Sequence, residues 1–373
     1  MYNRNFMRIA INLAKKNIGN TGINPSVACL IEKDNHIIGI GLTGESGRPH
    51  AEYNAMTKCK DQIKGSTVYV TMEPCSHEGA TPSCARILAE AGVAKVVSPI
   101  MDPNPVVNGK GFEILKNSGV EVFIDKEHSE KAKRIIEGFS KKILTGKPFV
   151  TLKLASSLDG KIALNSGKSK WISGIESRRK TQLLRYRNDG IMVGSKTFIE
   201  DNPELSIREN FGRKNQPVRV VLSSDCKILP KGKIFDTLKS QKTIIFTGYK
   251  GKKNWSDWEK AGANLIQVKS TKNSLDLHAV LYQLGSMGIS NLLVEGGANL
   301  SASLLNENLL DRIIIFYSGR IFGSSGISGI SKLEGEKIFL EDYPHFFIEE
   351  TRKYGNDLMV SWIKTSANLE SGS

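Results

Sequence analysis

Three potential zinc ligands and one carboxylate are spaced closely in the first part of the chain. His50 precedes Glu52 by two residues, and Cys75 and Cys84 follow. Three protein ligands leave one tetrahedral position of zinc open to water. Zinc lowers the pKa of that water toward neutrality, and a carboxylate that is not a ligand can transfer its proton. The pattern predicts a zinc-dependent deaminase, with one zinc per chain on His50, Cys75 and Cys84 and with Glu52 as the catalytic proton carrier.

A closed structural zinc site is the alternative, and it needs a fourth ligand. His77 is the obvious candidate, because it follows Cys75 by two residues. That arrangement would leave Glu52 without a role, so we favour the catalytic site. His36, His128, His278 and His345 have no partners by spacing, and we expect them at the surface.

Alternating helix and strand patterns must position these residues. His50 opens a helix, and residues i and i+2 of a helix point about 200° apart. A metal shared by this segment must therefore lie beyond the helix N-terminus. Cys84 begins another helix, whose positive end would stabilise a thiolate. In this half we predict helices at 5–17, 51–59, 84–91 and 129–147, and strands at 27–31, 37–41, 67–71, 95–98 and 120–123.

The second half also alternates, so the chain is of the α/β class. Gly146 and Pro148 interrupt the pattern, and we place a domain boundary there. The predicted domains are 1–146 and 147–366, followed by a tail at 367–373. In the second domain we expect helices at 177–187 and 298–306, and strands near 150–155, 190–193, 218–222, 243–246, 291–295 and 313–317.

The charge and composition narrow the range of partners. The net charge is +14, and it divides into +5 for residues 1–147 (20 basic, 15 acidic) and +9 for the remainder (32 basic, 23 acidic). No basic cluster alternates with aromatic residues, so we expect anionic small molecules and no nucleic acid. No apolar run approaches the ~18 residues of a membrane span. Five cysteines and no secretory signal suggest a cytoplasmic protein with reduced thiols.

The residues from Tyr69 to Cys84 closely resemble the N-terminal domain of the bifunctional riboflavin-biosynthesis deaminase/reductase family. The eight-residue gap between the two cysteines is part of this resemblance, as are Asn24-Pro25, Pro49–Glu52 and Asp102–Pro105. The resemblance continues to about residue 365. It implies a cytidine-deaminase-like α/β/α domain followed by a dihydrofolate-reductase-like α/β domain. It also implies that Asn24, Asp102 and Asn104 line the pyrimidine and ribose pocket.

The implied first reaction is deamination of 2,5-diamino-6-ribosylamino-4(3H)-pyrimidinone 5′-phosphate. Two positions depart from the family pattern. Ala28 stands where the family has Gly, and Ala80 stands where it has Arg or Lys, which suits a substrate phosphate. Either another cation replaces the missing one, with Lys110 and Arg86 as candidates, or deamination is weak.

The second domain carries the segments 153–163, 169–173, 193–208 and 292–300 that resemble the reductase of the same family. A strand that ends in Glu-Gly-Gly before a helix can bind phosphate with free backbone N–H groups. The resemblance implies hydride transfer from NADPH to C1′ of the ribose, with Asp201 assisting proton transfer. The implied NADPH contacts are Ala155, Trp171, Thr197, Asp201, Ser224, Gly297, Ala298, Asn299, Leu300 and Ser301.

The implied contacts with the phosphorylated substrate are Ser169, Arg185, Leu205, Arg208 and Glu295, and the arginine forks match phosphate oxygens. Two alternatives stay open. One is a zinc deaminase of another phosphorylated or nucleic-acid base with a degenerate second domain. The other is a non-catalytic module that binds zinc and nucleotide. By resemblance we expect a homo-oligomer.

Overall fold

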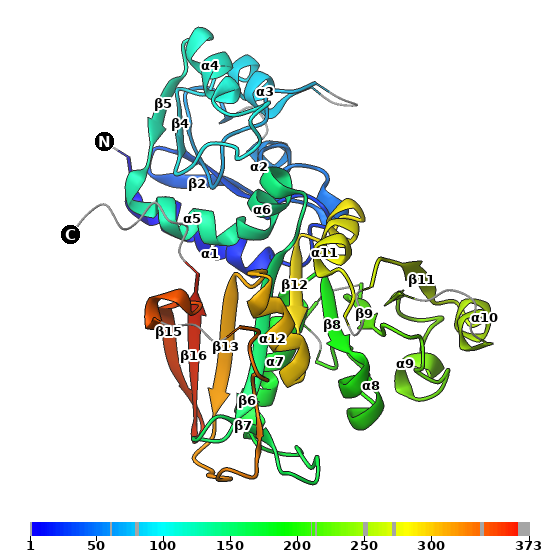
Figure 1. Cartoon of the computed structure of the whole chain (residues 1–373). Helices are drawn as coiled ribbons and strands as arrows, with labels where there is room; N and C mark the ends of the chain where they lie inside the picture. The colour runs from blue at the N-terminus through cyan, green and yellow to red at the C-terminus, as the bar shows by residue number, and fades with distance from the viewer. Residues whose placement is uncertain are drawn as a thin grey trace. The chain divides into compact units, whose positions relative to one another are not determined.

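Two compact units make up the chain, Met1–Lys147 and Pro148–Ser373. The computed structural model describes residues 2–59, 62–78, 82–209, 211–212, 215–248, 253–270, 274–335 and 339–364. Figure 1 traces the first unit in blue to green and the second in green to red. No helix among the described residues is long and apolar enough to cross a membrane.

A five-stranded sheet forms the centre of the first unit, in the order β2-β1-β3-β4-β5. β1 (Ala28–Lys33) pairs antiparallel with β2 (His36–Leu42) and with β3 (Thr67–Val70). β4 (Lys95–Ser98) and β5 (Glu121–Ile124) continue the sheet in parallel. Successive side chains of a strand point to opposite faces, and residues 28–31 are all buried. Both faces of the sheet are therefore covered.

Helices cover the sheet of this unit, and two of them, α2 and α3, begin at the candidate zinc ligands. α2 lies very close to β2, because a Cβ at Gly41 would be 2.0 Å from the Ala51 carbonyl oxygen and one at Gly39 would be 2.4 Å from Cys59 Sγ. Glycine therefore lets α2, which begins directly after His50, approach the sheet. The helices are α1 (Arg4–Asn17), α2 (Ala51–Cys59), α3 (Cys84–Glu90), α4 (Lys110–Asn117), α5 (Ser129–Ile135) and α6 (Glu137–Thr145).

Two expectations for this unit are wrong. The single helix predicted at 129–147 is two helices, α5 and α6, with a break at Ile136 (φ −106°, ψ 12°) where β-branched residues and Gly138 weaken helix formation. α6 ends at Thr145 because Gly146 adopts a left-handed conformation and its N–H donates to the Lys142 carbonyl. His128 is buried instead of exposed, with Nδ1 2.8 Å from the Asp125 carboxylate. The other three histidines named above are exposed, as predicted.

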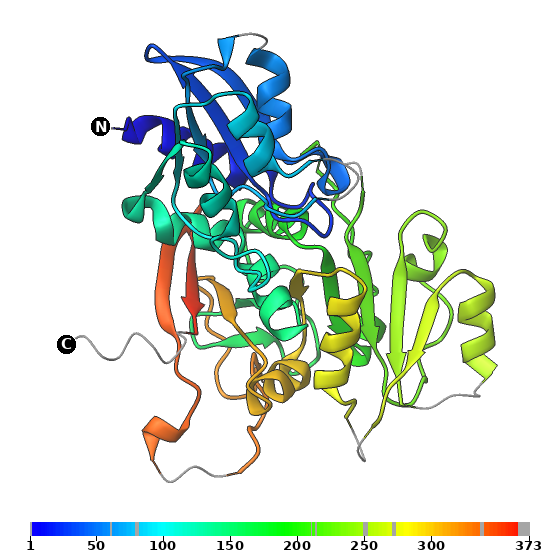
Figure 2. The same ribbon diagram turned by 90° about the horizontal axis from the view of Figure 1, so that it is seen from above.

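A nine-stranded sheet forms the second unit, in the order β11-β10-β9-β8-β12-β6-β13-β16-β15. The strands from β11 to β13 are parallel, and β16 and β15 add an antiparallel hairpin. The view from above shows the yellow-green strands at one end of this sheet and the orange and red strands at the other (Figure 2). The strands are β6 (Phe149–Ser156), β8 (Gly190–Gly194), β9 (Val218–Leu222), β10 (Thr243–Thr247), β11 (Asn264–Gln267), β12 (Asn291–Val294), β13 (Arg312–Tyr317), β15 (Phe347–Tyr354) and β16 (Asp357–Ile363).

Alternation along the strands divides the core of this unit between two helical layers. On β8, Met192 packs with α11 and α12, whereas Ile191 and Val193 pack with Ile234 and Trp258 on the other face. The strands are thus buried on both sides, as parallel sheets generally are. A small ribbon pairs β7 (Lys161–Ala163) with β14 (Ile327–Ser328). The helices are α7 (Ile175–Arg187), α8 (Ser195–Asp201), α9 (Lys233–Asp236), α10 (Lys253–Lys260), α11 (Leu277–Ser286) and α12 (Ala298–Asn306).

Candidate functional site

Three separate segments of the first unit bring His50, Cys75 and Cys84 together. His50 precedes α2, Cys75 follows β3, and Cys84 is the first residue of α3. His50 Nδ1 lies 3.5 Å from Cys75 Sγ and 3.4 Å from Cys84 Sγ, and all three atoms lie within 4.8 Å of one another. One nitrogen and two sulfurs at this spacing fit the donor set of a zinc ion with one open position.

The two cysteines of this cluster differ in their acidity. Hydrogen bonds from Cys84, with help from His50, hold the pKa of Cys75 at about 4, and the backbone N–H of Cys84 also donates to Cys75 Sγ at 3.2 Å. The pKa of Cys84 is raised, because its thiol is the donor. A metal binds cysteine as thiolate, so metal binding would require Cys84 to lose its proton.

A buried carboxyl group, Glu52, accompanies the cluster. Its side chain is 4% exposed, and burial raises its pKa to about 7, with a further contribution from the negative charge of Cys75. A carboxyl group with a pKa near neutrality can both accept and release a proton. His77 is exposed and is not part of the cluster, which argues against a closed four-ligand site.

Glu73, which was not among the predicted site residues, supports the loop that carries Cys75. Its carboxylate is 1% exposed and accepts hydrogen bonds from the backbone N–H groups of Asp102, Gly109, Gly111 and Phe112, at 2.8 to 3.3 Å. It therefore joins the loop after β4 and the start of α4 to the residue two positions before a candidate ligand.

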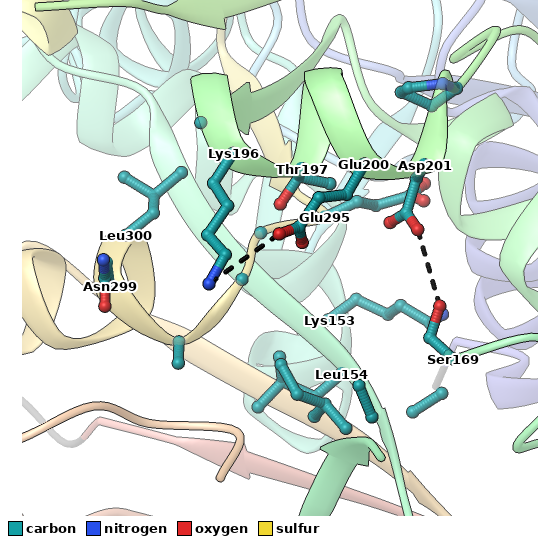
Figure 3. A pocket seen from close by; sticks show the side chains of 18 of the residues that line it. Lys153, Leu154, Ser169, Lys196, Thr197, Glu200, Asp201, Glu295, Asn299 and Leu300 are labelled. Atoms are coloured by element: carbon teal, nitrogen blue, oxygen red, sulfur yellow. Dashed lines mark hydrogen bonds and ion pairs between the residues drawn. The ribbon is translucent and has the colours of Figure 1, made fainter. Parts of the chain in front are cut away.

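A cavity of about 780 Å³ lies in the second unit. Its walls include Ala155 of β6, Gly194 of β8, Leu222 of β9 and Glu295 just after β12. These are the carboxyl ends of parallel strands, where open α/β sheets bind their ligands. In Figure 3, α8 carries Lys196, Thr197, Glu200 and Asp201, α12 carries Asn299 and Leu300, and Glu295 is drawn close to the α8 residues.

A nearly buried ion pair joins Arg185 and Glu295 at the cavity wall. Their side chains are 10% and 15% exposed, with Arg185 Nε and Nη2 donating to Glu295 Oε1 and Oε2 at 2.6 and 2.8 Å. Arg185 Nη1 donates to the Ser206 carbonyl at 2.8 Å. Burial alone would raise the pKa of Glu295, but the charge and hydrogen bonds of Arg185, with Lys153 as a second cation, hold that pKa below its ordinary value.

Arg208 and Lys153 add positive charge to the same cavity. Arg208 is exposed, and its guanidinium forms no ion pair within the described residues. Its backbone N–H donates to the Gln182 side chain at 2.9 Å. Lys153, which was not predicted, is half-buried on β6, and burial lowers its pKa while Glu295 opposes that shift. A lysine inside an otherwise apolar strand is a sequence signal that could have identified it.

Comparisons with known proteins cover both units. Residues 148–360 match the family model described as the RibD C-terminal domain, and residues 2–99 match the cytidine and deoxycytidylate deaminase zinc-binding region. The riboflavin biosynthesis protein RibD of Aquifex aeolicus is 37% identical, over 89% of this chain and 92% of its own length. The Escherichia coli protein of the same name is 35% identical, over 96% and 99%.

The chain belongs to the RibD family. Solved structures agree: Acinetobacter baumannii RibD superposes with a TM-score of 0.86 at 33% identity, over 97% of this chain and 99% of that one. A deaminase/reductase from Thermotoga maritima gives a TM-score of 0.85 at 32% identity, over 97% and 98%. The predicted fold class is confirmed, with a cytidine-deaminase-like first domain and a RibD reductase domain of the dihydrofolate-reductase type. The chain is a bifunctional enzyme of riboflavin biosynthesis.

The reductase cavity gathers most residues that the RibD resemblance implied. Leu205 and Ser301 are not in its wall: Leu205 is 1% exposed and packs in the core near Trp258, and Ser301 is fully buried and bonds to the Gly297 carbonyl. Their contacts with a ligand stay predictions. The lining residues that were predicted are Ala155, Ser169, Trp171, Arg185, Thr197, Asp201, Arg208, Ser224, Glu295, Gly297, Ala298, Asn299 and Leu300.

The three predicted substrate residues of the RibD deaminase unit shape their own loops. Asn24 Nδ2 donates to the Gly47 carbonyl at 2.9 Å. Asp102 accepts from the Asn104 N–H at 2.8 Å, and Asn104 accepts from the Val106 N–H at 3.0 Å. Their role in binding a pyrimidine stays a prediction.

The structure distinguishes between Lys110 and Arg86, the two candidates for the cation that is missing at position 80. Ala80 itself lies outside the described residues. Arg86 is paired with Glu78 and with Glu90, so its charge is already balanced. Lys110 is exposed at the start of α4, and it forms no ion pair within the described part of the chain. Lys110 is therefore the better candidate of the two.

Proposed function

We propose that this enzyme deaminates 2,5-diamino-6-ribosylamino-4(3H)-pyrimidinone 5′-phosphate and then reduces 5-amino-6-(5-phosphoribosylamino)uracil with NADPH. The observation that carries the proposal is the coexistence, in one chain, of a His/Cys/Cys cluster beside a buried carboxyl group and a cation-lined cavity at the carboxyl edge of a parallel sheet. The Thermotoga maritima relative is described as a deaminase and reductase of these substrates.

In the deaminase unit, His50, Cys75 and Cys84 would hold one zinc ion. Zinc supplies an activated water when it is bound. Glu52 would accept one proton from this water near neutral pH and deliver it to the ring nitrogen. It would then carry the second proton, which is released as the new carbonyl forms, to the departing amine, which leaves as ammonia. Its burial excludes bulk water from the proton and places the pKa at about 7, where both transfers are possible.

In the reductase unit, the start of α12 would hold a phosphate group of NADPH, which supplies the hydride when it is bound. The fit rests on unfilled donors: Gly297 caps α12 with no side-chain hydrogen bond, so backbone N–H groups there can bind an anion. A Cβ at position 297 would lie 3.2 Å from Thr197 Oγ1 and would meet no other atom within 4 Å, so there is room for a ligand beside the Gly297 backbone. Because Arg185 is satisfied by Glu295, we assign the substrate phosphate chiefly to Arg208.

Proton transfer in the reductase is assigned to Asp201. Ser169 Oγ donates to Asp201 Oδ1 at 3.4 Å, and both residues line the cavity (Figure 3). The serine thus orients a carboxylate that can carry a proton to or from the ribose. Within the described residues this is the one side-chain hydrogen bond to the Asp201 carboxylate, and its length leaves the carboxylate able to turn toward a substrate.

A coupled assay tests the proposal. The purified, zinc-loaded enzyme with the diaminopyrimidine phosphate and NADPH should release ammonia and then consume NADPH. A chelator should stop ammonia release and spare reduction of substrate that is already deaminated. Failure of both activities would refute the proposal, and reduction without deamination would refute its first half only.

The partners follow from the same sites. Phosphorylated pyrimidines are small anions, and the cavity cations suit them; we expect no nucleic-acid ligand. A homo-oligomer in the cytoplasm stays our expectation for the assembly and its location. Sedimentation of the purified enzyme would test the first, and fractionation of cells would test the second.

A further inference from the structure

Trp171 is a large aromatic residue at the wall of the reductase cavity, and its side chain is 60% exposed. We propose that Arg178 is a positioning residue that holds the Trp171 ring in place for NADPH. This inference rests on the proposed function, because it takes Trp171 as a surface on which the cofactor packs. No comparison assigns a role to Arg178.

Arg178 fixes the Trp171 segment at two points. Its guanidinium carbon lies 4.5 Å from the centre of the Trp171 ring, within the range of a cation–π interaction. Its Nη1 donates to the Ser173 carbonyl at 2.7 Å. One face of the ring is therefore covered, and the backbone two residues later is bound to the same side chain. The large exposed fraction leaves the rest of the ring open to a ligand.

The turn that carries Arg178 is itself fixed by a distant carboxylate. Gly174 precedes the first residue of α7, Ile175, and has no side chain to cap the helix. Asp357, at the start of β16, accepts from the Gly174 N–H at 2.7 Å and from Ser177 Oγ at 2.5 Å. Asp357 is 5% exposed and Ser177 is 1% exposed, so water competes little for these bonds. The helix start, and with it Arg178, has a defined position before any ligand binds.

A direct contact between Arg178 and a phosphate is the competing explanation, because Arg178 also lines the cavity. The two roles differ in what happens when Trp171 is removed. A positioning residue that acts through the ring loses its effect on NADPH binding in that background, whereas a phosphate ligand keeps it. A double-mutant cycle measures this difference.

The experiment compares R178M, W171L and the double variant in the full-length, zinc-loaded enzyme. R178M should raise the KM for NADPH about three- to tenfold with little change in kcat. W171L should raise it at least as much, and R178M should add nothing to W171L. R179M is the matched control: Arg179 is the exposed neighbour, 3.9 Å from Glu209 and outside the cavity wall, and its loss should leave KM unchanged.

A spectroscopic readout separates ring mobility from catalysis. The Trp171 indole N–H signal is the one that disappears from the ¹⁵N spectrum in W171L. In ligand-free R178M this signal should shift and show faster local motion, while the signals of Trp255, Trp258 and Trp362 stay unchanged. That pattern would also show that R178M is folded.

Three results would overturn the positioning role of Arg178. Equal effects of R178M with and without Trp171, or an unchanged indole signal, would overturn the positioning role. An R178M enzyme with wild-type KM would overturn it too. Failure of the proposed function looks different: wild-type enzyme would not consume NADPH at all, although the indole signal would still respond to R178M.

Discussion

Removal of Arg185 should destabilise the second unit far more than a surface substitution does, because it leaves the nearly buried Glu295 carboxylate in the cavity wall without its partner. In R185M, Glu295 keeps a side chain that is only 15% exposed and loses two charge-assisted hydrogen bonds, and the Ser206 carbonyl loses its donor. Breaking one side of a buried pair costs roughly 3–5 kcal/mol.

The structure favours the lower end of that range. Lys153 contributes a second positive charge near Glu295, so the carboxylate is not left wholly uncompensated. We expect a loss of about 3 kcal/mol in the free energy of unfolding. With a urea dependence of roughly 3 kcal/mol per molar for a unit of this size, the midpoint should fall by about 1 M.

Tryptophan fluorescence follows this unit selectively, because all four tryptophans lie in it: Trp171, Trp255, Trp258 and Trp362. The double variant R185M/E295M should recover most of the loss, since replacing both partners by apolar groups removes the unpaired charge. A loss below about 1 kcal/mol in R185M, or an equal loss in the double variant, would refute the reasoning.

The pH dependence of the free energy of unfolding provides an independent test of this prediction. The pKa of Glu295 is lowered in the folded wild-type enzyme, so its stabilising contribution is present above the unfolded value of about 4.3 and is lost as the pH falls through the folded pKa. In R185M, burial without the guanidinium raises that pKa instead. The gap in stability between the two proteins should therefore be large at neutral pH. It should begin to shrink above the unfolded value of about 4.3, where Glu295 of R185M takes up a proton, and should shrink further as the pH falls through the lowered pKa of the wild-type carboxyl group. A gap that stays constant with pH would mean that the loss comes from packing.

Four further outcomes are expected. E52Q should lower ammonia release by about 10²–10⁴-fold and leave zinc at one per chain by elemental analysis; zinc loss would instead make Glu52 a ligand. C84S should lose zinc and deamination while NADPH oxidation with deaminated substrate continues, and loss of both activities would contradict separate sites. R208M should raise the KM for the phosphorylated substrate about 10- to 150-fold, the equivalent of about 1.5–3 kcal/mol for hydrogen bonds to a charged group, but not for its dephosphorylated analogue. K153M should raise the urea midpoint at pH 7, because burial lowers the pKa of Lys153 and penalises its charged form. This gain in stability should vanish above about pH 10.4, where the lysine of the unfolded chain is neutral. A gain that persisted at that pH would contradict this cause.

Elements with strong local patterns could be predicted from the sequence. The helix at 51–59, the strand at 95–98 and the helix at 298–306 have the predicted bounds. The antiparallel hairpin of β15 and β16 was missed, because β15 is largely exposed and carries little apolar alternation. Its place at the sheet edge depends on pairing between β16 and β13, a contact between residues far apart in the chain.

The site residues also differ in how far their contacts could be predicted from local sequence. His50, Glu52, Cys75 and Cys84 stand in a short motif, so their types and spacing were enough to predict that they meet. Arg185 and Glu295 were each predicted as substrate contacts, yet the structure pairs them with one another. They are 110 positions apart, and no local pattern distinguishes an arginine that binds a phosphate from one that neutralises a carboxylate.

Buried carboxylates that bind backbone N–H groups explain why the supporting residues escaped prediction. Glu73 holds the start of α4 and the Asp102 loop, and Asp357 holds the start of α7. A buried carboxylate is costly unless its oxygens are satisfied, and backbone donors at a helix start satisfy it whatever side chains that helix carries. The helix therefore shows no complementary residue in its sequence, and its partner can lie 183 positions away, as Asp357 does from Gly174. The chemistry of the His50, Cys75 and Cys84 cluster is consequently readable from a short motif, whereas the rigidity of the segments that present each site depends on acidic residues that look, in the sequence, like ordinary surface charges.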